Sequence, residues 1–179
     1  MTENKVSSTR NKNRTTIKFI VINGLTAALY VVFTAPFANI AYGPIQFRIA
    51  EVLTVLPIFS AGTIPGVTLG CFIANLINPN NLGPVDIIGG TLATLIAGYF
   101  SWLIGKKNKP LGIIPPIVFN GLIVGGYLPF LLVDPGSTVT VQAVGGSMLS
   151  VAGSEAVLLI VLGLPLIALI AKTKIKELL

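Results

Sequence analysis

Residues 42–57 read YGPIQFRIAEVLTVLP, and they place an arginine and a glutamate at the start of an apolar run. Arg48 and Glu51 are three positions apart, so a helix that begins near Ile45 would put both side chains on one face. A charged side chain inside hydrocarbon costs roughly 2.5–3.5 kcal/mol on insertion scales, so such groups normally face a partner, a cavity or a ligand. This stretch is therefore the first candidate for a functional site.

The composition predicts an integral membrane protein. Of the 179 residues, 53% are hydrophobic and only 10% are charged, and the mean hydropathy is +0.87. This is too apolar for an ordinary soluble domain. Six spans of about 20 residues would leave only short connections, so we expect an all-α, polytopic bundle of six transmembrane helices.

Proline- and glycine-rich turns separate the apolar runs. They predict a cytoplasmic basic tail over residues 1–16, a six-helix transmembrane domain over 17–171, and a second cytoplasmic tail over 172–179. The six predicted spans cover residues 17–36, 49–63, 64–77, 86–104, 113–133 and 146–171.

Positive charge sets the expected orientation. With six spans and the N-terminus inside, eleven of the twelve Lys and Arg residues lie on the inner face, and only Arg48 lies outside. Cytoplasmic loops carry such an excess of positive charge. We therefore expect both termini in the cytoplasm, and we interpret the basic residues as orientation signals rather than as a nucleic-acid surface.

The sequence lacks the residues that several functions need. The single cysteine, Cys71, lies in an apolar run, and the chain has no histidine, so we expect no intrachain disulfide and no metal site. The sequence has no phosphate-binding loop for ATP hydrolysis and no hydrolase or protease motif. We predict that the chain is not an enzyme and holds no cofactor.

Polar residues gather near the predicted outer ends of the spans, where they would form a cup open to the outside. The predicted substrate-binding residues are Gln46, Arg48, Glu51, Asn75, Asn78, Asp86, Tyr127 and Glu155. A polar path through to the cytoplasm, which a channel or a secondary transporter needs, is not evident.

Structural alternatives exist for some of these residues. Arg48 and Glu51 can pair with each other at the membrane surface, and Asp86 can be the N-cap of its span. Glu155 lies some ten residues into the last span without a basic residue in the same run, so a purely structural role suits it least. Asn120 lies deeper and is interpreted as bonding to a neighbouring helix.

Small residues at four-residue spacing indicate close helix packing in membranes. One row comprises Gly66, Gly70 and Ala74, and Gly24 with Ala28 forms another on the first span. We expect the first row to pack within the chain. The second is an equal candidate for contact with another protein.

Four segments together resemble the QueT family of substrate-binding (S) subunits of energy-coupling factor (ECF) transporters. They are QFRIAEVLTVLP, GVTLGCFIANLINPNN, GPVDIIGGTLATLIAGY and SEAVLLIVLGLP. The resemblance extends from about residue 23 to residue 164, and YGPIQFRIAEVL is its most specific part.

The resemblance implies a six-helix S component of the plasma membrane that captures a queuosine precursor, a 7-deazaguanine, from outside the cell. It also implies a transmembrane coupling protein and two ATPase subunits as partners, so that ATP is used by those subunits and not by this chain. Related S components dock the coupling protein through small residues on the first helix, where Gly24 and Ala28 stand. Alanine is usual at both positions, and Gly24 departs from that pattern.

Other functions remain open at this point. An S component for riboflavin, thiamine or biotin is the nearest alternative, and a stand-alone secondary transporter is the next. A small membrane enzyme or assembly factor is the third. Uptake by the chain without ATPases would indicate a secondary transporter.

Overall fold

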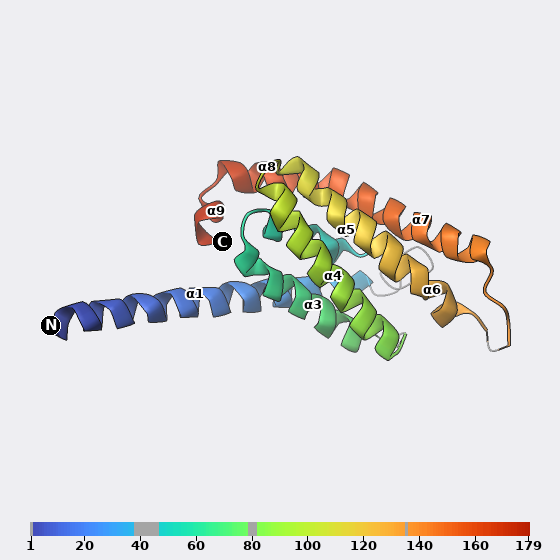
Figure 1. The fold of residues 1–179 in the computed structure, drawn as a ribbon, viewed down its shortest axis with the longest axis horizontal. Helices are drawn as coiled ribbons and strands as arrows, with labels where there is room; N and C mark the ends of the chain where they lie inside the picture. The colour runs from blue at the N-terminus through green and yellow to red at the C-terminus, as the bar shows by residue number, and fades with distance from the viewer. Residues whose placement is uncertain (1, 38–46, 79–81, 135) are drawn as a thin grey trace.

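The computed structural model describes residues 2–37, 47–78, 82–134 and 136–179, and every element in these ranges is helical (Figure 1). In chain order the elements are α1 (Thr2–Thr34), η1 (Ala35–Phe37), η2 (Ile49–Ile58), η3 (Ala61–Thr63), α3 (Ile64–Leu76), α4 (Pro84–Gly105), η4 (Pro110–Ile113), α5 (Ile114–Phe119), η5 (Asn120–Val124), α6 (Gly125–Leu132), α7 (Val141–Leu158), η6 (Leu159–Gly163), α8 (Leu164–Lys172) and α9 (Ile175–Leu178). The predicted all-α class is confirmed.

Four described segments are long and apolar enough to cross a membrane. They are Arg14–Phe37, Pro84–Gly105, Pro110–Leu132 and Val141–Lys172. Two shorter apolar helices, Ile49–Ile58 and Ala61–Leu76, stand where the second and third spans are expected. The chain is thus a helical membrane bundle, while the count of six spans and the cytoplasmic termini stay predictions.

Two helices begin before the spans that the sequence predicts. Helix α1 begins at Thr2, so it extends into the predicted tail, whose place outside the membrane stays a prediction. The last span begins at Val141 rather than at Gly146. Glu155 therefore lies near the middle of the run Val141–Lys172, deeper than expected.

The segment predicted as the second span contains a 3-10 helix, η2, which is largely buried within the bundle. Eight of its ten residues are buried, and it contacts both α1 and α4. A 3-10 helix rises about 2.0 Å per residue, so η2 is about 20 Å long, against about 15 Å for an α-helix of the same length. Residues three apart eclipse one another in this helix type, which aligns Glu51 and Thr54 along one edge, and Arg48 precedes the helix as its N-cap residue.

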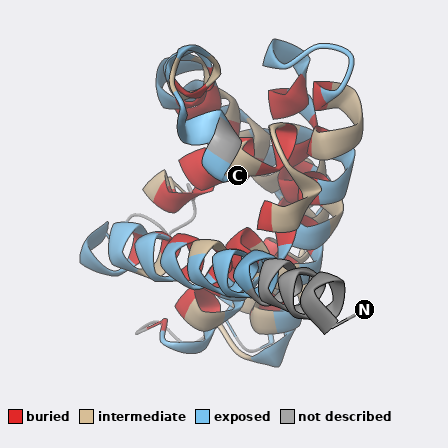
Figure 2. Ribbon diagram, turned by 90° about the vertical axis from the view of Figure 1, so that its left-hand side faces the viewer, coloured by how far each residue is buried: buried red, intermediate tan, exposed pale blue. Residues whose placement is uncertain are grey.

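Glycines on α3 let it approach α1 closely, as the sequence predicts. A Cβ atom added at Gly70 would lie 2.5 Å from the Cβ atom of Tyr30 and 3.1 Å from the Cα atom of Ala27. One added at Gly66 would lie 2.9 Å from the Cα atom of Asn23. This face of α1 is buried, whereas most residues from 14 to 33 are exposed (Figure 2).

We expect Gly70→Ala to destabilise the protein by about 1–3 kcal/mol, because the added methyl group overlaps backbone and ring atoms of α1. Thermal unfolding of the protein in detergent would measure the loss. Gly153→Ala on α7 is the matched control, since a Cβ atom there would meet nothing within 4 Å. Equal unfolding temperatures for the two variants would contradict the packing described here.

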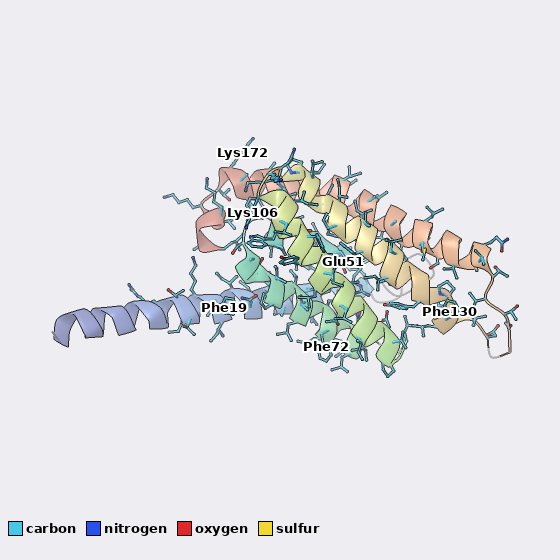
Figure 3. The ribbon with its side chains drawn as sticks, in the orientation of Figure 1. Phe19, Glu51, Phe72, Lys106, Phe130 and Lys172 are labelled. Carbon is cyan, nitrogen blue, oxygen red and sulfur yellow. The ribbon has the colours of Figure 1, made fainter. Side chains whose placement is uncertain are left out.

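A buried apolar cluster joins η2, η4, η6 and α8 through Val55, Ile113, Leu159 and Ile167 among others. Its member Ile170 lies two residues before Lys172. In Figure 3, Lys106 and Lys172 both lie toward the same end of the helical bundle. A second apolar cluster joins α4, η5, α6 and α7.

Candidate functional site

A small polar cavity lies between η2, α4, η5 and α7. Its water-accessible volume is about 20 Å³, and it is lined by Arg48, Glu51, Gly90, Asn120, Val124, Val151 and Glu155. The three charged side chains are nearly inaccessible, since Arg48, Glu51 and Glu155 are 7%, 4% and 5% exposed. The cavity brings together three of the predicted substrate-binding residues from segments far apart in the sequence.

One oxygen of Glu51 accepts a hydrogen bond and also faces a guanidinium group, near the centre of the view in Figure 3. The Tyr30 hydroxyl donates a hydrogen bond of 2.5 Å to Oε1, and Nη1 of Arg48 lies 3.8 Å from the same atom. Oε2 is buried and has no hydrogen-bond partner among the described residues. The expected Arg48–Glu51 pair therefore exists, but in the interior rather than at the surface.

Glu155 has a different environment. Its Oε1 atom is buried without a hydrogen-bond partner in the described part of the chain, and Glu51 repels it as a nearby like charge. The side chain of Asn120 lies against both carboxylates. A buried carboxylate that lacks a dedicated cation is costly, so the cavity is suited to a ligand that donates hydrogen bonds or carries positive charge.

Two turns of π-helix interrupt the spans that carry Asn120 and Glu155. The first, η5, begins at Asn120, and the second, η6, begins at Leu159, one turn after Glu155. Such turns are rare and appear frequently at functional sites. Their positions add to the indication that this cavity is the functional centre.

A second polar cluster adjoins the cavity. The Tyr127 hydroxyl donates to Oδ1 of Asp86 at 2.8 Å, and Nδ2 of Asn75 donates to the backbone oxygen of Asp86 at 3.2 Å. Cys71 links this cluster to the cavity, because its Sγ atom accepts from Asn75 at 3.6 Å and from Nη1 of Arg48 at 3.5 Å. The two groups of polar residues thus form one connected network.

The glycines of α4 make room for this cluster. A Cβ atom at Gly90 would lie 2.7 Å from Nδ2 of Asn75, and one at Gly89 would lie 2.7 Å from the Tyr127 ring. Gly83, with a φ of +84°, is the N-cap of α4. The N-cap interpretation of Asp86 is therefore wrong, because this residue lies inside the first helical turn.

The predicted site residues thus fall into three groups. Arg48, Glu51 and Glu155 line the cavity. Asn75, Asp86 and Tyr127 lie behind it, and Asn78 is buried just after the end of α3. Gln46 lies outside the described residues.

The sequence interpretation missed two residues of this site. Tyr30 is completely buried and contacts Glu51, but an aromatic residue inside an apolar span carries no sequence signal of such a role. Asn120 does contact neighbouring segments, as expected, but it also lines the cavity. Its position as an isolated amide in the predicted fifth span was the available signal.

Gly24 and Ala28 lie on the exposed side of α1. A Cβ atom at Gly24 would meet nothing within 4 Å. A neighbouring side of the same helix carries the buried residues Asn23, Ala27 and Tyr30. The two small residues are thus accessible to another helix.

Comparison with known proteins shows to which family the chain belongs. The model of the QueT transporter family matches residues 20–172 of the chain. The queuosine precursor transporter QueT of Lactococcus lactis subsp. cremoris (strain MG1363) is 42% identical over 79 residues, which are 43% of this chain and 45% of that protein. The chain thus matches less than half the length of this relative, and no solved structure matches. Because the family model covers most of the sequence, the chain belongs to the QueT transporter family.

Proposed function

We propose that this protein captures a queuosine precursor of the 7-deazaguanine class in the cavity between Glu51 and Glu155. In this proposal it is the S component of an ECF transporter in the plasma membrane, and it takes the substrate from the extracellular side. A coupling protein and two ATPase subunits then drive uptake. The name of the Lactococcus lactis relative and the family membership support this substrate class.

The observation that carries the proposal is the pair of buried carboxylates with unpartnered oxygens, Oε2 of Glu51 and Oε1 of Glu155. The guanine-like face of a 7-deazaguanine offers two adjacent N–H donors and a carbonyl oxygen. One carboxylate can accept the two donors, and the Arg48 guanidinium or the Asn120 amide can donate to the carbonyl. The cavity supplies each complementary group.

The cavity is smaller than the proposed substrate. A water-accessible volume of about 20 Å³ is room for about one water molecule, whereas a deazaguanine has on the order of a dozen heavy atoms. Substrate capture therefore requires the segments that line the cavity to separate.

The residues behind the cavity support Arg48 in this proposal. Asn75 and Arg48 both donate to Cys71, and Asn75 and Tyr127 both bond to Asp86. Removal of one member would leave the others buried without their partners, which costs about 1–3 kcal/mol per group. We propose that these residues influence substrate affinity mainly by positioning Arg48.

An S component fits better than a stand-alone secondary transporter. Apolar side chains of η2, η4, η6 and α8 form a buried cluster that includes Ile170, two residues before Lys172. We infer that this cluster closes the cavity toward that end. A transporter that works alone needs access to its site from both sides, so we infer that release requires partner subunits.

Uptake assays test this function directly. Cells that express the chain together with a coupling protein and its ATPases should accumulate labelled 7-aminomethyl-7-deazaguanine, and cells that express the chain alone should bind it without accumulation. Equal accumulation in both strains would instead indicate a secondary transporter. Accumulation of an unrelated vitamin instead of the deazaguanine would indicate an S component with a different substrate.

A further inference from the structure

We infer that the two carboxylates of the cavity have separate tasks: Glu51 binds the guanine-like face, and Glu155 binds a positively charged substituent at position 7. The substrate would then be an aminomethyl-7-deazaguanine, which carries an ammonium group, rather than a neutral derivative such as the nitrile. This inference rests on the function proposed above.

The charged groups that line the cavity do not balance one another. The cavity is lined by one guanidinium and two carboxylates. Arg48 lies within ion-pair distance of Glu51 and is the dominant charged neighbour of that residue. Glu155 lines the same cavity, and the ion pair that Arg48 makes there is with Glu51. An ammonium group beside Glu155 would balance the remaining negative charge, which a buried site strongly favours.

Glu51 has one carboxylate oxygen available to a ligand. Oε1 of Glu51 already accepts from Tyr30 and faces Arg48, which leaves Oε2 directed at the ligand. The Arg48–Glu51 pair thus presents donors and an acceptor side by side. The carbonyl oxygen and the adjacent N–H of a guanine-like face require this combination.

Asn120 lines the cavity together with both carboxylates, and its side chain interacts with each of them. In an aminomethyl-7-deazaguanine, the carbonyl oxygen lies between the ring N–H donor and the aminomethyl group. A carbonyl oxygen can accept two hydrogen bonds. A ligand placed with its N–H at Glu51 can therefore present its carbonyl to Arg48 and Asn120 and its ammonium to Glu155.

Binding measurements with two ligands test the inference. Isothermal titration of the purified full-length protein would use 7-aminomethyl-7-deazaguanine and 7-cyano-7-deazaguanine, which differ only in the substituent. The wild type should bind the amine at least about tenfold more tightly, because a hydrogen bond to a charged partner is worth that factor or more. Glu155→Gln should weaken the amine far more than the nitrile, so that the ratio of the two affinities falls to about twofold or less.

The matched control is Asp134→Asn, the same exchange at an exposed carboxylate, which should change neither affinity. An equal loss for both ligands in Glu155→Gln, or an undiminished preference for the amine, would overturn the inference. Failure of the wild type to bind either ligand would contradict the proposed function itself.

Tyr30→Phe provides a second test that removes only a hydroxyl group. This hydroxyl donates to Glu51, which contacts the face that both ligands share. The variant should therefore weaken both ligands by the same factor and leave their ratio unchanged. A change in the ratio would show that Glu51, rather than Glu155, distinguishes the substituents.

Discussion

Replacing Glu51 by glutamine is expected to weaken the binding of 7-deazaguanines by at least about 100-fold. The carboxylate accepts the N–H donors of the ligand in our account, and each hydrogen bond to a charged group is worth about 1.5–3 kcal/mol. The amide of glutamine would also place an N–H group beside the donors of Arg48 and Tyr30. Titration of the purified variant would measure the loss.

The same variant leaves Arg48 buried without its ion-pair partner, which costs up to about 3–5 kcal/mol of stability. A double variant, Arg48→Gln with Glu51→Gln, removes both charges and separates the two effects. It should recover most of the unfolding temperature lost in Glu51→Gln but should not recover binding. Recovery of binding together with stability would mean that Glu51 serves the fold and does not contact the substrate.

Gly24→Leu is expected to reduce energised uptake at least about tenfold while substrate binding stays within about twofold. Gly24 lies on the exposed side of α1, and we propose that the coupling protein packs there, next to Ala28. Small residues allow helix backbones to approach closely in membranes, and a leucine would hold the partner away. Uptake in cells and titration of the purified variant would measure the two quantities separately.

Gly153→Leu is the control for this experiment. Gly153 is also exposed on a membrane helix, α7, and a Cβ atom there meets nothing within 4 Å. This control should keep full uptake. Wild-type uptake by Gly24→Leu, or an equal defect in the control, would exclude the α1 surface as the docking site.

The fold was largely predictable because the long apolar runs are mostly bounded by glycine or proline. Gly83 with Pro84, for example, indicates the start of α4. The 3-10 conformation of η2 was not predictable, because a segment of ten mostly apolar residues satisfies several helical periods equally well. Only its position between α1 and α4 shows that the short segment lies in the centre of the bundle.

The site was predictable where a charge interrupts an apolar run, as at Glu51 and Glu155. Such residues stand out because their burial is costly. Tyr30 and Asn120 could not be assigned in this way, because their roles depend on which helices cross. Asp86 illustrates the reverse case: its charge stands out in the sequence, yet it bonds to Tyr127 behind the cavity.

Mass spectrometry of the small molecules that co-purify with the chain tests the central claim most directly. Wild-type protein purified from cells that make queuosine precursors should release a 7-deazaguanine, and the aminomethyl form should predominate. Glu51→Gln, purified in parallel, should release none. A different compound released by the wild type, or the same deazaguanine retained by the variant, would contradict the account.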